Sequence, residues 1–214
     1  MTDISELRKE YTQASLDESD LHDNPLNQFA FWFDQAVRTA GDDANAMVLS
    51  TLQPNGRPSS RVVLLKDLDQ QGFVFFTNYA SAKGQALAAN PWASLLFFWP
   101  GLERQVRIEG HVAKISESAS DDYYRSRPLQ SRVGAWASPQ SQVIASRQWL
   151  ADAFARYQAQ LGNDPVRPAH WGGYCLSPDR VEFWQGRPSR LHDRLVYTKA
   201  PDVASGWRRQ RLAP

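Results

Sequence analysis

Hydrophobic residues recur every three or four positions in one segment near the N-terminus, which predicts an amphipathic helix. Asn24 suits the N-cap position, Pro25 suits the first helical turn, and Gly41 suits the position after the last turn. The sequence therefore predicts a helix over residues 25–40, with an apolar face formed by Phe29, Trp32, Phe33, Ala36, Val37 and Ala40. The preceding residues 1–23 carry few apolar side chains and are expected to form a flexible tail.

Farther along the chain, short apolar runs and alternating apolar and polar positions predict β-strands. Residues 92–99 are a continuous apolar run that ends at Pro100 and Gly101, as expected for a buried strand. Residues 105–115 alternate instead, which predicts a strand with one solvated face. Strands are expected at residues 46–52, 61–68, 73–78, 92–99, 105–115, 173–176, 180–185, 191–198 and 207–212.

Further helices are expected at residues 81–90, 117–127 and 139–161, with Ser81 and Ser138 as N-caps of the first and last. The closely spaced strands favour antiparallel pairing. The helices do not alternate regularly with the strands, which argues against a doubly wound parallel sheet. We therefore expect an α+β fold that is mainly β, with residues 24–214 forming a single domain.

Composition excludes several classes of protein. Lys and Arg total 24 against 23 for Asp and Glu, and this near-neutral balance argues against a dedicated nucleic-acid binder. Aromatic residues make up 12% of the chain, which suits a β-rich core, a large interface or a site for a flat ligand. The single cysteine excludes an internal disulfide and a multi-cysteine metal site. The sequence contains neither a bilayer-spanning apolar run nor a secretory signal, so a cytoplasmic, non-membrane protein is expected.

The common local signatures of catalysis are absent. The chain lacks the glycine-rich motifs G-x-x-x-x-G-K-[ST] and G-x-G-x-x-G, and it lacks the nucleophile motif G-x-S-x-G. The four histidines do not lie at metal-ligand spacings, and Cys175 is expected in the core, so no metal site is predicted.

Cations and hydroxyls instead gather in short clusters, of which two precede residue 90. Arg61 and Lys66 enclose an apolar strand and point to opposite faces unless a bulge intervenes; they could equally be ordinary strand-end charges. Residues 77–83 combine hydroxyls, a helix start and Lys83, which suits a phosphate group.

Two more clusters follow. Tyr123, Arg127 and Ser131 can all donate to phosphate, and arginine does so with two parallel hydrogen bonds; the alternative is a solvated helix end. Residues 190–194 place Arg190, His192 and Arg194 on one face of the expected strand. Like charges on one face are costly unless an acid or an anion lies opposite them. The alternative is the charged, exposed face of an edge strand.

These clusters, in order along the chain, resemble the pyridoxine (pyridoxamine) 5′-phosphate oxidase family. The most specific segments are R-L-H-D-R at residues 190–194 and the terminal R-L-A-P at residues 211–214. The other matching segments are residues 8–11, 61–66, 75–78, 102–106, 123, 126–128, 134–136, 140–141, 171–173 and 182–186.

The resemblance implies an antiparallel split β-barrel of the FMN-binding type with flanking helices, which binds FMN at the interface of a homodimer. It also implies oxidation of pyridoxine or pyridoxamine 5′-phosphate to pyridoxal 5′-phosphate. Electrons would pass to FMN and then to O₂, giving H₂O₂, and the amine substrate would also release ammonia.

The resemblance further implies roles for individual residues. Arg190 and His192 would be the catalytic pair, flanking the pyridine ring together with Leu191. The substrate phosphate would be held by Lys66, Tyr123, Arg127 and Ser131, and a flexible cover over the substrate would be formed by Arg8, Lys9, Glu10 and Tyr11. The FMN contacts would be Arg61, Val62, Val63, Leu64, Leu65, Lys66, Phe76, Thr77, Lys83, Gln105, Gln140, Ser141, Trp184 and Arg194.

The chain departs from the family pattern at two positions. Ala82 stands where arginine is common, so one expected donor to the FMN phosphate is missing, and Phe76 stands where tyrosine is common.

The sequence leaves two alternative functions open. One is a split-barrel protein that binds flavin or pyridoxal phosphate without turnover. The other is a nucleic-acid-binding barrel, suggested by Arg208, Arg209 and Arg211 but disfavoured by the net charge.

Overall fold

The computed structural model describes residues 4–6 and 9–214 of the chain. The chain divides into two compact units. The terminal unit comprises Met1–Leu49, Ser94–Gly110 and Pro178–Pro214, and the central unit comprises Ser50–Ala93 and His111–Ser177.

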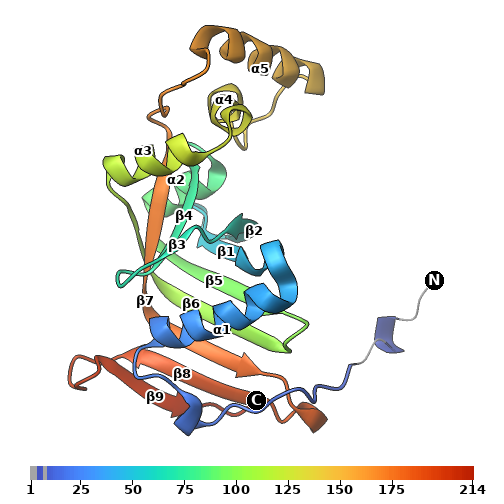
Figure 1. Cartoon of the computed structure of the whole chain (residues 1–214), viewed down its shortest axis with the longest axis vertical. Helices are drawn as coiled ribbons and strands as arrows, with labels where there is room; N and C mark the ends of the chain where they lie inside the picture. The colour runs from blue at the N-terminus through green and yellow to red at the C-terminus, as the bar shows by residue number, and fades with distance from the viewer. Residues whose placement is uncertain (1–3, 7–8) are drawn as a thin grey trace. The chain divides into compact units, whose positions relative to one another are not determined.

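Nine strands of the described residues form one sheet, in the order β2-β1-β5-β6-β7-β4-β3, with β8 paired to β7 and β9 paired to β8 (Figure 1). The pairings β3–β4, β4–β7, β7–β8 and β8–β9 are antiparallel, as the sequence predicts. The strands are β1 (Ala46–Leu52), β2 (Pro58–Leu64), β3 (Asp67–Leu68), β4 (Phe73–Asn78), β5 (Trp92–Trp99), β6 (Arg104–Lys114), β7 (Trp171–Gln185), β8 (Asp193–Lys199) and β9 (Trp207–Arg211).

Five α-helices lie within the described residues: α1 (Pro25–Ala40), α2 (Ala82–Ala89), α3 (Glu117–Ser126), α4 (Leu129–Ala137) and α5 (Arg147–Leu161). Helix α1 has the predicted bounds because its ends carry the predicted signals. The Asn24 side chain accepts a hydrogen bond from the Leu26 amide, and Gly41 at the C-cap has a φ of 58°. No helix among the described residues combines the length and apolar character that crossing a membrane requires.

Aromatic side chains of α1 form the core of the terminal unit. The ring of Phe29 lies 4.8 Å from that of Phe97, and Trp32 meets Phe183 edge-on at 5.2 Å. All four side chains are almost fully buried. Such pairs add about 0.5–1.5 kcal/mol each to the stabilisation from burial itself.

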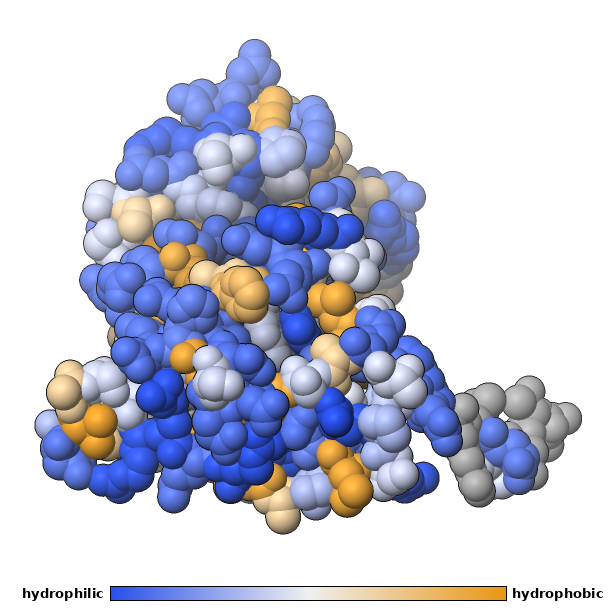
Figure 2. Space-filling view, turned by 60° about the horizontal axis from the view of Figure 1, so that its bottom comes forward, coloured by the Kyte–Doolittle hydropathy of each residue, from blue (hydrophilic) through white to orange (hydrophobic). Residues whose placement is uncertain are grey.

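The surface in Figure 2 is mostly hydrophilic, with hydrophobic residues in small groups.

Three element predictions are wrong in detail. The helix expected at 139–161 is the shorter helix α5, which begins at Arg147 with Ser146 as its N-cap; the expected cap Ser138 is instead the C-cap of α4, a helix that was not predicted. The strands expected at 173–176 and 180–185 are the single strand β7. The strand expected at 61–68 is interrupted after Leu64. Within residues 9–23, which were expected to form a tail, the side chains of Leu16 and Leu21 are buried.

Candidate functional site

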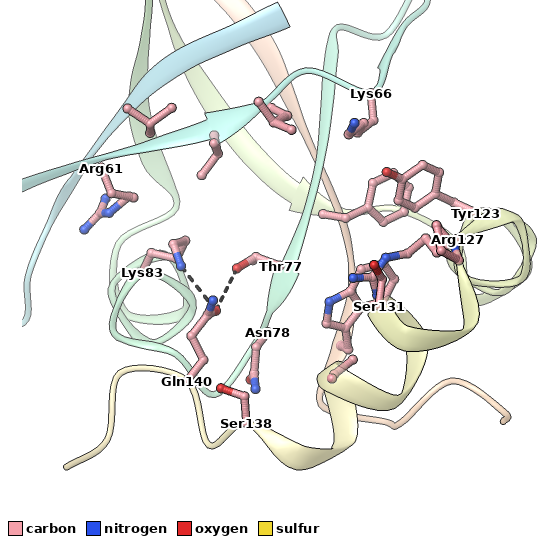
Figure 3. Close-up of a pocket in the computed structure, with 18 residues that line it drawn as sticks. Arg61, Lys66, Thr77, Asn78, Lys83, Tyr123, Arg127, Ser131, Ser138 and Gln140 are labelled. Carbon is pink, nitrogen blue, oxygen red and sulfur yellow. Dashed lines mark hydrogen bonds between the residues drawn. The ribbon is translucent and has the colours of Figure 1, made fainter. Parts of the chain in front are cut away.

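A pocket of about 850 Å³ opens in the central unit, a volume within the usual range for small-molecule sites. It is formed by the end of β2, by β4 and by residues of α2, α3 and α4 (Figure 3). Its lining residues are Arg61, Val62, Val63, Leu64, Lys66, Phe76, Thr77, Asn78, Lys83, Tyr123, Arg127, Pro128, Ser131, Gly134, Ala135, Ser138, Gln140 and Trp171. Four of these residues are cationic, and this set contains no carboxylate.

One side of the pocket is built where β4 runs into α2. Ser81 caps the helix by accepting a hydrogen bond from the Gly84 amide, and this turn brings Lys83 beside the end of the strand. The ammonium group of Lys83 and the hydroxyl of Thr77 both donate to Oε1 of Gln140, each over 3.3 Å (Figure 3). Thr77, Lys83 and Gln140 therefore form one connected polar group in the pocket.

The cations on this side are electrostatically strained. Burial lowers the pKa of Lys83, and the nearby charge of Arg61 lowers it further. Burial also lowers the pKa of Arg61, whose guanidinium donates to the hydroxyls of Thr51 and Ser59 over 2.8 and 2.9 Å. An anion in the pocket would relieve the cost of holding these two positive groups near each other.

The other side of the pocket carries a second polar group, formed by Lys66, Tyr123, Arg127 and Ser131 (Figure 3). The guanidinium of Arg127 lies 4.5 Å from the ring centroid of Trp171, and burial lowers its pKa. Its Nη1 atom is buried and has no hydrogen-bond partner among residues 4–6 and 9–214. A buried guanidinium nitrogen without a partner indicates that an acceptor belongs there.

Flat rings form a wall next to Arg127. Phe76 and Tyr123 stack with centroids 3.8 Å apart, and Phe76 also stacks with Trp171 at 5.5 Å. Gly173 leaves no spare room behind this wall, because a Cβ atom added there would lie 2.4 Å from Cδ1 of Ile115 and 2.9 Å from Phe76. The wall is therefore closely packed from behind.

Arg61 and Lys66 line the same pocket, although an uninterrupted strand would direct them to opposite faces. The interruption after Leu64 explains this, since β2 ends there and β3 begins at Asp67. The amide of Lys66 donates to the carbonyl of Val74 in β4. The backbone of Lys66 is therefore positioned by its hydrogen bond to β4, and the alternation of side chains along β2 does not extend to it.

A second pocket, of about 560 Å³, lies in the terminal unit and is lined by Lys9, Glu10, Tyr11, Trp184, Arg187, Ser189, Arg190 and His192. The rings of Trp184 and His192 lie 4.7 Å apart. Burial lowers the pKa of His192, and the charge of Arg190 lowers it further. The prediction that Arg190 and His192 lie on a strand is wrong, because both precede β8 and Arg190 has a φ of 63°.

Several predicted site residues line neither pocket within the described part of the chain. Leu65 is buried, Ser141 and Leu191 are exposed, and Gln105 is half-buried. Arg194 is directed to Glu182, whose Oε1 accepts from its Nε over 2.9 Å, and to the carbonyl of Ala213. Arg8 lies outside the described residues.

The pockets also contain residues that sequence reasoning did not select. In the central unit these are Asn78, Pro128, Gly134, Ala135, Ser138 and Trp171, and in the terminal unit they are Arg187 and Ser189. The segments 75–78, 126–128, 134–136 and 171–173 were already part of the family resemblance, which was the available signal for Asn78, Pro128, Gly134, Ala135 and Trp171. Ser138 was noted only as an expected helix cap.

Comparison with known families gives two matches that together span most of the chain. Residues 33–161 match the family model described as pyridoxamine 5′-phosphate oxidase. Residues 171–214 match the model described as the pyridoxine 5′-phosphate oxidase C-terminal dimerisation region. The chain is 58% identical over its full length to pyridoxine/pyridoxamine 5′-phosphate oxidase 1 of Ralstonia nicotianae and 57% identical to the corresponding protein of Ralstonia pickettii; each match covers the whole of both chains.

Solved structures confirm the expected split-barrel fold. The crystal structure of PhzG from Burkholderia lata, in complex with tetrahydrophenazine-1-carboxylic acid, is similar with a TM-score of 0.85 and 30% identity, and covers 93% of this chain and 98% of that one. An FMN-binding, pyridoxamine 5′-phosphate oxidase-related protein from Nostoc punctiforme is similar with a TM-score of 0.71 and 22% identity, over 89% of this chain and 98% of that one. The second likeness concerns the fold alone.

Proposed function

The chain belongs to the pyridoxamine 5′-phosphate oxidase family, with FMN as its cofactor, and we propose that it oxidises pyridoxine or pyridoxamine 5′-phosphate to pyridoxal 5′-phosphate. The alcohol loses two electrons and two protons, which reduce O₂ to H₂O₂. The amine loses the same electrons and protons, and a water molecule then replaces the nitrogen, which leaves as ammonia.

The observation that carries this proposal is the arrangement of cations in the central pocket. Arg61 and Lys83 lie on one side, and Lys66 and Arg127 lie on the other (Figure 3). Two separate cation pairs without a carboxylate between them suit two phosphate groups, one on FMN and one on the substrate. The aromatic wall next to Arg127 suits flat rings.

The residues of the pocket fit FMN. The volume is sufficient, and an anion would relieve the mutual repulsion of Arg61 and Lys83. We assign the FMN phosphate to Arg61, Lys83 and the hydroxyl of Thr77; Gln140 orients Lys83, and the single Thr77 proton would turn from Gln140 to the phosphate. When bound, FMN supplies the hydride acceptor and the route of electrons to O₂. The protein's task is to bind and orient both molecules and to keep their reacting atoms together.

The substrate is assigned to the other side of the pocket. Arg127 presents a buried nitrogen that lacks a partner, and Lys66, Tyr123 and Ser131 add a charge and two hydroxyls. Burial raises the pKa of Tyr123, so its hydroxyl stays protonated and can donate to a phosphate oxygen. Arg190 and His192 are proposed to contact the pyridine ring, and residues 9–11 are proposed to cover it.

We also propose that the active form is a homodimer, in which residues of both chains build the flavin site. The match of residues 171–214 to a dimerisation region supports this. Light scattering should give twice the mass of one chain. An FMN-loaded monomer with full activity would contradict a site built from two chains.

The proposed reaction is tested with purified FMN-loaded protein. Each phosphorylated vitamer should bleach the flavin absorbance anaerobically and produce one H₂O₂ per turnover in air. Binding of FMN without bleaching by either vitamer would favour the non-catalytic alternative. Bleaching by a tetrahydrophenazine carboxylic acid, the kind of ligand bound by PhzG, in preference to the vitamers would indicate a different substrate class. The two phosphate-binding groups favour the vitamers.

A further inference from the structure

A carboxylate is buried in the turn between β5 and β6 of the terminal unit. Glu103 is only 2% exposed, and its φ of 55° lies in the left-handed region that side chains other than glycine rarely adopt. A buried charge in a strained backbone position is costly unless its surroundings compensate it. The partners of Glu103 therefore indicate why it is there.

The partners of this carboxylate come from the N-terminal segment of the same unit. Oε2 accepts hydrogen bonds from the backbone amides of Thr12 over 2.8 Å and Gln13 over 3.1 Å, and Oε1 lies 3.3 Å from the ammonium of Lys9. Burial opposes ionisation of Glu103, but these hydrogen bonds outweigh it and lower its pKa. The carboxylate thus fixes the backbone of a segment more than 85 residues away in sequence.

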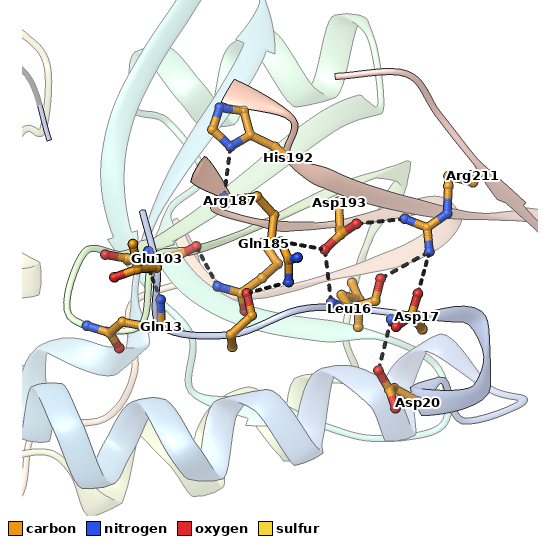
Figure 4. A network of polar contacts seen from close by, with 12 residues as sticks. Gln13, Leu16, Asp17, Asp20, Glu103, Gln185, Arg187, His192, Asp193 and Arg211 are labelled. Carbon is orange, nitrogen blue, oxygen red and sulfur yellow. Dashed lines mark hydrogen bonds and ion pairs between the residues drawn. The ribbon is translucent and has the colours of Figure 1, made fainter. Parts of the chain in front are cut away.

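The backbone of Glu103 is attached to the strand that leads into the second pocket. Its carbonyl accepts from the Gly186 amide over 2.8 Å and from the side chain of Gln185 over 3.3 Å. Figure 4 shows Glu103 beside both Gln13 of the N-terminal segment and Gln185. Glu103 therefore links residues 12 and 13 to the end of β7, immediately before Arg187, Arg190 and His192.

This link determines where the ring of Tyr11 lies. The ring packs directly on Gly186, where an added Cβ would lie 2.6 Å from its Cγ, so no other residue fits at position 186 without displacing it. Tyr11 meets Trp184 edge-on at 5.5 Å and His192 at 5.7 Å. A second attachment follows at Leu16, whose amide donates to Asp193 over 3.1 Å (Figure 4).

We infer that Glu103 is a positioning residue of the site: its carboxylate holds the Thr12 and Gln13 amides so that Tyr11 stands as a fixed wall beside Trp184 and His192. The kinetic consequence of this inference rests on the proposed oxidation of a vitamin B6 phosphate. The structural part does not, because it concerns only the order of residues 9–16.

The structural part is tested by amide hydrogen exchange on the FMN-loaded protein. Glu103→Gln keeps the size of the side chain but removes the charge that binds Lys9 and the two amides. Exchange of a peptide covering residues 9–16 should accelerate by about tenfold, since charge-assisted hydrogen bonds are replaced by weaker neutral ones. Asp202→Asn is the matched control, because it removes an exposed ion pair with Arg208 in the same unit. Unchanged exchange in Glu103→Gln would overturn the inference.

The kinetic part is tested with a second variant that displaces Tyr11 by another route. Gly186→Ala and Glu103→Gln should each raise KM for pyridoxamine 5′-phosphate by about tenfold while FMN affinity stays unchanged. Because both act through Tyr11, the double variant should be no worse than the more severe single variant. Additive effects, or a loss of FMN affinity in Glu103→Gln, would contradict a positioning role. If the unmodified protein oxidises neither vitamer, the proposed function fails, while the exchange experiment still decides the role of Glu103.

Discussion

The backbone N–H of Arg187 donates a hydrogen bond to Nδ1 of His192 over 3.1 Å (Figure 4). A ring nitrogen that accepts a hydrogen bond carries no proton, so neutral His192 must hold its proton on Nε2. The loop between the two residues is shaped for this contact, since Ser189 and Arg190 both adopt positive φ, at 56° and 63°. The loop backbone therefore selects the tautomer of His192 and leaves Nε2–H as a donor.

We expect His192 to remain neutral and in the Nε2–H form at neutral pH. Its pKa is below the ordinary value of 6.5 because of burial and the charge of Arg190, so it gains a proton only as pH falls below 6.5. Protonation adds a hydrogen to Nδ1 and breaks the bond from Arg187. Nitrogen-15 NMR should detect this tautomer, and the rate of flavin bleaching should fall on the acidic side of pH 6.5. A His192 that titrates above 6.5 would contradict the assignment.

Replacing Arg127 with Ala should weaken binding of the phosphorylated substrate, because it removes a buried charged donor. Hydrogen bonds to charged groups contribute about 1.5–3 kcal/mol, which corresponds to an increase in KM of roughly 10–100-fold. Arg127→Lys should give an intermediate value, since it keeps the charge but loses the planar fork. The flavin content of Arg127→Ala should match the unmodified protein. Unchanged KM would mean that the substrate phosphate lies elsewhere.

The fold was predictable where local signals were unambiguous, as in α1, whose cap residues occur once each in the right order. The prediction of helix bounds failed where the same capping signal occurs twice. Ser138 followed by Pro139 has the chemistry of a helix start, but Ser146 caps α5 in the same way, by accepting from the Trp149 amide over 3.0 Å. Ser141 has a φ of 72°, which ends any helix there. Only packing of the whole unit selects between two such capping residues.

Strand β7 illustrates the opposite error. Two strands were expected, at residues 173–176 and 180–185, and Pro178, which cannot donate to a sheet hydrogen bond, lies between them. In the structure Pro178 lies between Leu176, where pairing with β4 ends, and Arg180, where pairing with β8 begins. The missing N–H is therefore tolerated where β7 changes partners, which depends on the sheet order and cannot be read from neighbouring residues.

The central pocket was largely predictable, because most of its cations and hydroxyls lie in dense local clusters. That Arg61 and Lys66 face the same pocket was not predictable from strand alternation, since it depends on the end of β2 at Leu64. The anchoring role of Glu103 was also missed. Its partners Thr12 and Gln13 use backbone amides, which leave no trace in the pattern of side chains.

Gly173→Ala should destabilise the protein by about 1–3 kcal/mol, the usual effect of forcing a methyl group into a packed interior. The new Cβ would collide with Ile115 and press on Phe76, so the aromatic wall of the pocket should shift as well. Gly134→Ala is the matched control, because a Cβ there meets nothing within 4 Å and the position is helical. Urea denaturation of both variants measures the difference. Equal stability would mean that the Ile115 side chain moves away at little cost.

Ala82→Arg should tighten FMN binding only slightly. Ala82 opens helix α2 beside Lys83, at the position where the resemblance implies a missing phosphate donor, but its side chain is exposed. An exposed ionic contact contributes less than about 1 kcal/mol, so the dissociation constant should fall by at most about fivefold. Lys83→Ala should raise it by more than about tenfold, because Lys83 is partly buried in the pocket and bonded to Gln140.

Titration of FMN into apoprotein, followed by flavin fluorescence, separates these two effects. The gain from Ala82→Arg should shrink as salt is raised from about 0.01 to 0.15 M, because the screening length falls from about 30 to 8 Å. The loss from Lys83→Ala should change less, since a partly buried contact is screened less. Turnover at saturating FMN should be unaffected by Ala82→Arg, because position 82 is assigned to the phosphate end of the cofactor. A weaker affinity in that variant would show that the existing donors already satisfy the phosphate.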